Sequence, residues 1–323
     1  MNFFKKLFTF KRTRMIDEAV FFHNPVTLGK NILSFIVTLI IASLIVAFMQ
    51  AIPLVAYMFS SDGAMDTLLY GSEDELASLV GNIPSWITGV DLLFTGIFIL
   101  VAIYYCKKHE NRSFFTMGFV KDRCVPEYLV GFLIGGTMIG LTILLNIAFG
   151  TVEISFSGFS PVIFLFLIGF IVKGFAESSF VYGYFTVSVA RDYAPIVAIV
   201  SGTFAYLVFS ITGAVVTVVS VLNILLIGFF AGAYVFKRGS IFGISAFLSS
   251  WSFTQLSIFS PSIDTSPLVL AKSVGSDYIT GGSSGVGGGL CATIILVASI
   301  FVLLLTPAKS SQISDFESNS FGV

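Results

Sequence analysis

The sequence predicts an all-α fold, a polytopic transmembrane helical bundle with about eight spans. Of its 323 residues, 56% are hydrophobic and only 11% are charged, and the mean hydropathy is +0.96. A soluble domain has about 25% charged residues, so this composition indicates a chain embedded in membrane lipids. The sequence has neither a long basic face nor a zinc-finger spacing, and we therefore expect no nucleic-acid partner.

Each span needs about 20 predominantly apolar residues, and eight stretches meet that requirement. They are residues 32–58, 86–105, 128–150, 161–187, 195–211, 216–236, 241–259 and 290–306. Pro53 lies inside the first stretch and is expected to kink it. The third stretch carries two pairs of glycines, Gly131/Gly135 and Gly136/Gly140, whose small-xxx-small spacing lets helices approach closely.

The connections between these stretches differ in length and composition. Residues 212–214 are expected to form a tight connection, whereas residues 260–289 are rich in glycine and serine and are expected to form a long loop. We divide the chain into a basic N-terminal arm at 1–30, two transmembrane helices within 31–110, a transmembrane core at 111–306 and a polar tail at 307–323.

Basic residues gather on alternate connections. Five lysines and arginines precede residue 15, and five more follow the second stretch, whereas the opposite connections hold Lys272 and otherwise mainly acids. Cytoplasmic loops of membrane proteins carry an excess of lysine and arginine. We therefore expect an even number of spans with both termini, including the arm and the tail, in the cytoplasm. The expected location is the cell membrane, as a multi-pass protein of a bacterial plasma membrane.

The fourth stretch contains two charged residues, Lys173 and Glu177, within the segment IVKGFAESSFVYGYFTVS at 171–188. A spacing of four residues places both on one face of a helix. Ionisable groups inside a span are costly and mark functional candidates. Two interpretations follow: a structural ion pair that lets the helix bury its charge, or a functional carboxylate at Glu177.

The segment that begins at Glu177 reads Glu-Ser-Ser-Phe-Val-Tyr-Gly. It resembles the first motif, Glu-Glu-x-x-x-Arg-Gly, of the CPBP family of intramembrane metalloproteases, also called the CAAX-protease or bacteriocin-processing (Abi) family. The first glutamate and the glycine agree with that motif. The second glutamate is replaced by Ser178 and the arginine by Tyr182.

The surroundings of the later motifs are similar to the family as well, whereas the motif residues depart from it. The helix at 222–232 and the turn Lys237-Arg238-Gly239-Ser240-Ile241 resemble the family's Gly-x-x-x-Gly helix and Arg-x-Gly-Ser-Leu turn. The segment at 111–119 and the glycines at 281–289 also resemble family segments, so that the resemblance covers residues 111–306. The positions of the family's metal-binding histidine, second histidine and asparagine are occupied here by Ser210, Leu248 and Ser252; an alternative register places Val208 at the first of them.

The resemblance implies a zinc ion held by two carboxylates and two histidines, which would activate a water molecule. Such a site needs about three protein ligands and an open position. The chain has only two histidines, His23 and His109, and both lie outside the predicted spans. We therefore expect a CPBP-like core whose catalytic motifs are degenerate, without a metal site and without a cofactor.

Three functional hypotheses remain open. The first is a pseudoenzyme, similar to bacteriocin-immunity proteins, that binds a peptide, a lipidated chain or another membrane protein. The second is an active membrane-embedded endopeptidase, of the CAAX-type or bacteriocin-processing kind, whose catalytic site around Glu177 differs from the family's motifs, with Tyr182 or Ser210 as participants. The third is a small transporter or carrier that uses the Lys173–Glu177 pair, although the sequence shows no inverted repeat of the kind found in transporters.

Overall fold

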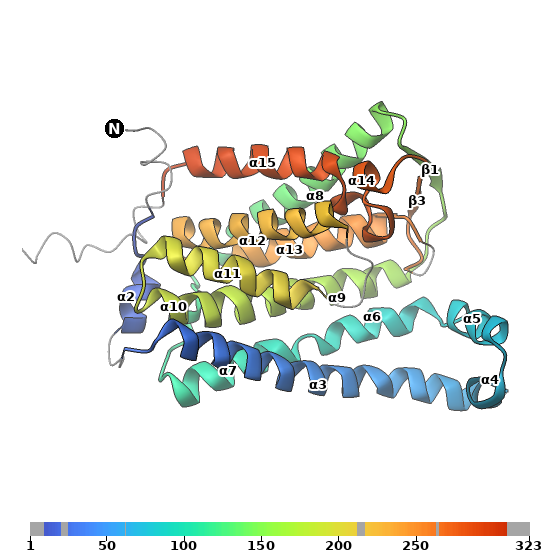
Figure 1. Ribbon diagram of the computed structural model, residues 1–323, viewed down its shortest axis with the longest axis horizontal. Coiled ribbons are helices and arrows are strands. Elements are labelled where there is room, and N and C mark those ends of the chain that lie inside the picture. The colour runs from blue at the N-terminus through green and yellow to red at the C-terminus, as the bar shows by residue number, and fades with distance from the viewer. Residues whose placement is uncertain (1–9, 21–24, 62, 212–216, 263–264, 309–323) are drawn as a thin grey trace, which may run out of the picture.

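The computed structural model describes residues 10–20, 25–61, 63–211, 217–262 and 265–308, and it is mostly helical (Figure 1). Within these residues, five helical segments are long and apolar enough to cross a membrane. They are α3 (Leu28–Ser60), α6 with α7 (Ser85–Phe94 and Ile97–His109), α8 (Cys124–Ala148), α9 with its continuation (Val162–Ala190), and α12 (Val218–Arg238).

Three further apolar segments are helical but shorter. They are α11 (Pro195–Ser210), α15 (Leu290–Leu305), and α13 (Phe242–Phe253) with the π-helix η3 (Thr254–Ile258). Each of the eight predicted stretches therefore coincides with helical structure. The remaining helical elements are α2 (Arg14–Val20), α4 (Ala64–Tyr70), α5 (Glu73–Gly81), η1 (Phe115–Met117), α14 (Asp277–Thr280), η4 (Gly282–Ser284) and η5 (Val286–Gly288).

The predicted boundaries were close, and the interruptions were not foreseen. Helix α3 begins at Leu28 and runs through Pro53 to Ser60. The second predicted stretch is divided between α6 and α7 at residues 95–96. The fourth consists of α9 (Val162–Glu177), the π-helix η2 (Ser178–Thr186) and α10 (Val187–Ala190). The connection at 212–214, part of the N-terminal arm and most of the polar tail lie outside the described residues.

The expectation of an all-α fold was incomplete, because the chain also forms a small sheet. Its strands are β1 (Val152–Phe156), β2 (Phe259–Ser260) and β3 (Val269–Ser273), in the order β1-β3-β2. β1 runs antiparallel to β3 and β2 parallel to it. Glu153 lies directly opposite Lys272, and opposite charges at such a position stabilise a strand pair. Part of the long loop predicted at 260–289 is therefore paired structure.

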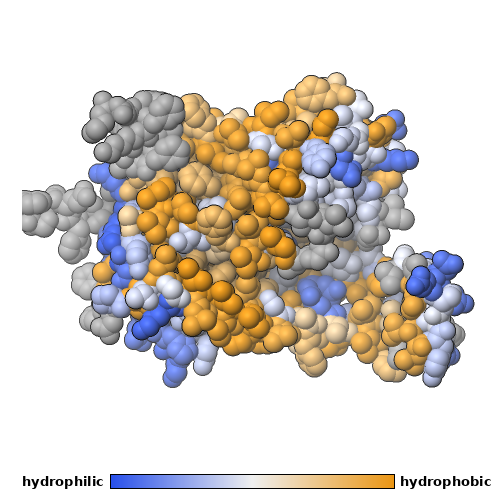
Figure 2. Space-filling view, viewed as in Figure 1, coloured by the Kyte–Doolittle hydropathy of each residue, from blue (hydrophilic) through white to orange (hydrophobic). Residues whose placement is uncertain are grey.

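The helices are arranged with α13 at the centre (Figure 1). It packs against α8 and α9, while α11 packs against α12 and α12 against α15. α3 packs with α6 and α7 into a separate layer, which joins the rest through the contacts of α6 with α9 and of α7 with η2. On the face drawn in Figure 2, apolar side chains cover the middle of the molecule and hydrophilic ones lie at its two ends. This distribution suits a protein whose middle faces lipid.

Connections that are distant in the sequence meet at one end of the bundle. The backbone N–H of Val26, ahead of α3, donates to the Asp192 carboxylate, which follows α10, at 3.1 Å. Lys237, near the end of α12, donates to the carbonyl of Leu304, near the end of α15, at 2.8 Å. The start of α3 therefore lies beside the end of α10, and the end of α12 beside the end of α15, and Figure 1 draws all four at the same end of the bundle.

The two glycine pairs of α8 have different surroundings. A methyl group added at Gly131 would lie 2.0 Å from the carbonyl oxygen of Gly243, and one at Gly135 would lie 2.4 Å from the carbonyl oxygen of Phe247. Both carbonyls belong to α13, so this pair of glycines permits the close approach of α8 and α13. Gly140 has open space around it.

We predict that Gly131→Ala destabilises the protein by about 1–3 kcal/mol, the usual cost of overpacking. The opposing atoms are backbone atoms of α13, which cannot rotate away as a side chain would. The measurement is the apparent melting temperature of the detergent-solubilised protein. Gly140→Ala, on the same helix, is the control and should be neutral or stabilising by up to about 1 kcal/mol. Equal melting temperatures of the two variants would contradict the close approach of α8 and α13.

Candidate functional site

Glu177 is the last residue of α9, where the α-helix passes into the π-helix η2. It lies fifteen positions after Val162 and thirteen before Ala190, the ends of this span. The residue is thus close to the middle of this helical segment. π-helical turns are rare and often occur at functional sites.

The Glu177 carboxylate is enclosed and has a partner on each oxygen. Lys173 Nζ forms an ion pair with Oε1, and the Tyr206 hydroxyl of α11 donates to Oε2 at 3.4 Å. The Glu177 side chain is 4% exposed, whereas that of Lys173 is 32% exposed. The structure therefore places Lys173 and Glu177 in direct contact, with the Glu177 side chain shielded and the Lys173 side chain partly exposed.

The motif positions do not all gather around this ion pair. Ser178 Oγ donates to the Gly174 carbonyl of its own helix at 2.7 Å. Tyr182 is fully buried, with its hydroxyl donating to the Gly228 carbonyl at 3.3 Å and its ring stacked on that of Tyr206. Leu248 is a buried core residue of α13. These three positions have structural roles.

Glu177, Ser210 and Ser252 line one cavity of about 500 Å³ together with Lys173. The cavity lies between the layer of α3 and the helices α9, α11, α12 and α13. On the face drawn in Figure 2 the surface is hollowed between the layer of α3 and α6 and the helices above it. Much of the wall is apolar, and its larger apolar residues are Leu39, Val46, Phe98, Phe209, Ile224, Ile227, Trp251 and Leu256. A volume of this size suits a ligand as large as a drug molecule.

An amide-rich wall of the cavity was not identified from the sequence. The Asn223 side-chain amide donates to the carbonyls of Gly287 and Gly289 at 3.0 and 2.9 Å. Gln255 donates to the Ser284 carbonyl at 2.7 Å. These bonds fix the glycine-rich segment 284–289 against α12 and η3. The sequence feature that could have revealed this wall is Asn223, an asparagine inside an apolar stretch, since such residues usually hydrogen-bond across helices.

An aromatic cluster adjoins the cavity opposite this wall. The rings of Phe98 and Phe209, which line the cavity, are 4.8 Å apart, and both contact Phe180 of η2. Phe35 of α3 also packs on Phe180, with ring centroids 5.5 Å apart. The cluster therefore joins α3, α7, α11 and η2 and provides an apolar floor.

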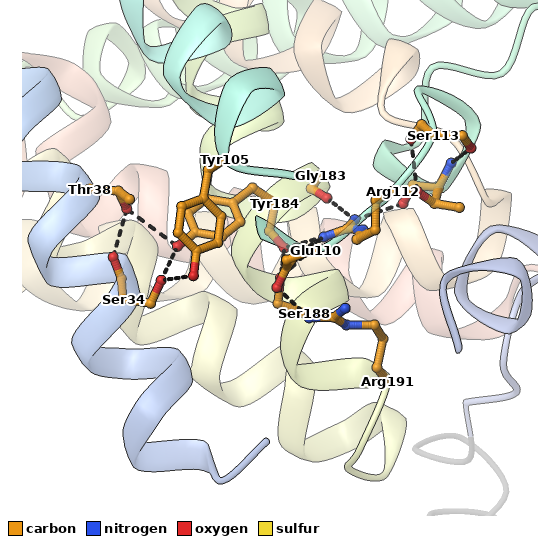
Figure 3. A network of polar contacts seen from close by, with 11 residues as sticks. Ser34, Thr38, Tyr105, Glu110, Arg112, Ser113, Gly183, Tyr184, Ser188 and Arg191 are labelled. Atoms are coloured by element: carbon orange, nitrogen blue, oxygen red, sulfur yellow. Dashed lines mark hydrogen bonds and ion pairs between the residues drawn. The ribbon is translucent and has the colours of Figure 1, made fainter. Parts of the chain in front are cut away.

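Beyond the aromatic cluster lies a second polar group, whose residues fall in connections between the predicted stretches (Figure 3). Glu110 forms ion pairs with Arg112 and Arg191, both of them buried. Arg112 also donates to the carbonyls of Gly183 and Tyr184 in η2, at 2.5 and 3.1 Å. Burial lowers the pKa of Arg191, and the neighbouring Glu110 carboxylate opposes that effect. This cluster holds the C-terminal half of the fourth helical segment, η2 and α10, rather than lining the cavity.

A chain of hydroxyl groups ties the same half of the span to α3 (Figure 3). Tyr184 lies 2.9 Å from Ser34 Oγ and accepts from Thr38 at 3.3 Å, while Ser34 also donates to Tyr105 of α7. Interhelical hydrogen bonds of this kind stabilise membrane bundles modestly, by about 0.6 kcal/mol each.

The donor set around Glu177 does not fit a zinc ion. Lys173 occupies one carboxylate oxygen, and the cavity residues include no histidine, cysteine or second carboxylate. The described part of the chain contains no group of three or more His, Cys, Asp or Glu residues that could hold a metal ion. Comparison of the chain with protein-family models, with curated proteins and with solved structures finds no match.

We predict that Lys173 and Glu177 depend on each other for stability. Lys173→Leu or Glu177→Leu should each cost about 3 kcal/mol, the lower end for breaking a buried pair, because Lys173 remains partly exposed. The double substitution should recover most of that loss. Thermal unfolding of the three variants in detergent measures the coupling. Strictly additive losses would show that the two side chains do not stabilise each other.

Proposed function

We propose that the chain is a multi-pass membrane protein with a CPBP-like core, which binds a ligand in the Glu177 cavity without hydrolysing it. The ligand class is a peptide, a lipidated chain or an apolar segment of another membrane protein. The observation that supports this proposal best is the cavity itself, which combines apolar walls, a shielded ion pair and amide groups. Binding sites are typically lined in this way, with few polar groups that fix orientation.

The alternative, an active endopeptidase that uses Glu177, has one observation in its favour. Glu177 and Ser210 line the same cavity and Tyr206 donates to the carboxylate, so that an acid or base and a hydroxyl group lie near a possible substrate. The ion pair with Lys173 weighs against it, because the ammonium takes the position beside Oε1 where an activating cation would sit. We therefore favour binding over catalysis.

We further propose that all eight helical segments cross the membrane and that both termini are cytoplasmic. The contacts of Val26 with Asp192 and of Lys237 with Leu304 support this arrangement, since they join connections that the distribution of lysine and arginine assigns to one side. The acidic helices α4 and α5 belong to the connections on the opposite side. The bacterial plasma membrane stays the expected location.

Filling the cavity should abolish binding. Ala47 is an exposed residue of α3 that lines the cavity, so Ala47→Trp should occupy the space without disturbing the packed core. The expected result is loss, by tenfold or more, of the molecule that copurifies with the protein from membranes, measured by mass spectrometry. Ala56→Trp is the matched control, since Ala56 is an exposed residue of the same helix about two and a half turns further along, and so points to the opposite side of the helix. Equal copurification in both variants would argue against a ligand in this cavity.

The orientation has its own test. In a variant whose three cysteines are replaced, a membrane-impermeant thiol reagent should label Tyr70→Cys in intact cells and should leave Lys108→Cys unlabelled until the membrane is opened. Both positions are exposed, so accessibility to the reagent depends on the side of the membrane alone. The reverse labelling pattern would refute the proposed orientation.

A further inference from the structure

The ion pair of the cavity is asymmetric, and a ligand meets its positive end first. The Lys173 side chain is 32% exposed and that of Glu177 only 4%. Both oxygens of the carboxylate already have partners, Lys173 and Tyr206. A lysine ammonium has three donors, and among the described residues the Lys173 ammonium donates to Glu177 alone. The cavity therefore presents a cation with unused donors, while its anion is shielded.

The other residues that line the cavity carry no charge. Lys173 and Glu177 are the charged residues among those that line the cavity. Most of the larger neighbours on α3, α12 and α13 are apolar, among them Val46, Ile224 and Trp251. A ligand that uses both features needs one group that accepts hydrogen bonds from an ammonium and a long apolar part. A single partly compensated cation suits a head group with one negative charge better than a dianionic phosphate.

We propose that the cavity binds a fatty acid, a single-chain amphiphile with one carboxylate. The carboxylate accepts hydrogen bonds from Lys173 Nζ, and the acyl chain lies along the apolar walls. A charge-assisted hydrogen bond is about twice as strong as a neutral one, and the apolar walls hold the acyl chain without exposing it to water. This assignment rests on the proposed binding function and specifies its ligand class.

The test compares two probes that differ only in the head group, dodecanoic acid and dodecanol. Binding of the radiolabelled acid to the full chain in nanodiscs is measured with the alcohol as competitor and with empty nanodiscs as the blank. We expect the wild-type protein to prefer the acid by tenfold or more. Glu177→Gln should raise the affinity for the acid severalfold, because Lys173 then lacks its competing internal partner.

The variant Lys173→Met/Glu177→Gln keeps the cavity neutral. It should bind dodecanoic acid and dodecanol with about equal affinity. Lys272→Met, at an exposed position of β3 outside the cavity, should behave as the wild type. Equal affinities for acid and alcohol in the wild type, or a preference that survives in the double variant, would overturn the carboxylate assignment and leave a binding cavity in place. Binding of neither probe would also overturn it, and the copurification experiment with Ala47→Trp then decides separately whether the cavity binds another ligand.

Discussion

The hydrogen bonds from Arg112 to the π-helix η2 are the constraint on which the centre of the structure depends. A span in a bilayer has no water to satisfy its backbone, and Arg112 supplies donors to the carbonyls of Gly183 and Tyr184. Held in this way, η2 directs Tyr182 toward the Gly228 carbonyl of α12 and Tyr184 toward Ser34 of α3. One interaction thus positions the span that carries Glu177 against the helices on both sides.

The cavity follows from how the two layers are joined. α6 packs closely on α9, where a methyl group added at Gly169 would lie 2.7 Å from the Leu92 side chain, and η2 is bound to α3 through Tyr184. Between these two attachments, α3 presents Leu39, Ser43, Val46, Ala47 and Gln50 to the cavity. These positions recur every three to four residues and so form one face of the helix. On this side the cavity is therefore bounded by an ordered helix face.

The sequence predicted the helices well because hydropathy over about 20 residues is a strong local signal. The spacing of Lys173 and Glu177 was equally local, and the structure brings them together. Contacts between distant segments could not be read in this way. The pairing of Glu153 with Lys272, the ion pair of Glu110 with Arg191, and the bonds of Asn223 to the glycine-rich segment all join residues that only the folded chain brings together. The π-helix has no simple periodic signature, so its presence after Glu177 was also beyond the sequence pattern.

Lys173 determines what kind of ligand the cavity can discriminate. A lone carboxylate in an apolar enclosure would attract a cation or take up a proton. With Lys173 paired to it, the formal charge of the lining is zero, and the lining exerts no net long-range attraction on either sign of charge. What remains is a local dipole whose exposed end is positive, set in apolar walls. Such a lining favours a ligand that places a hydrogen-bond acceptor at Lys173 and an apolar part along the walls. An amphiphile has both groups, whereas a simple ion has no apolar part.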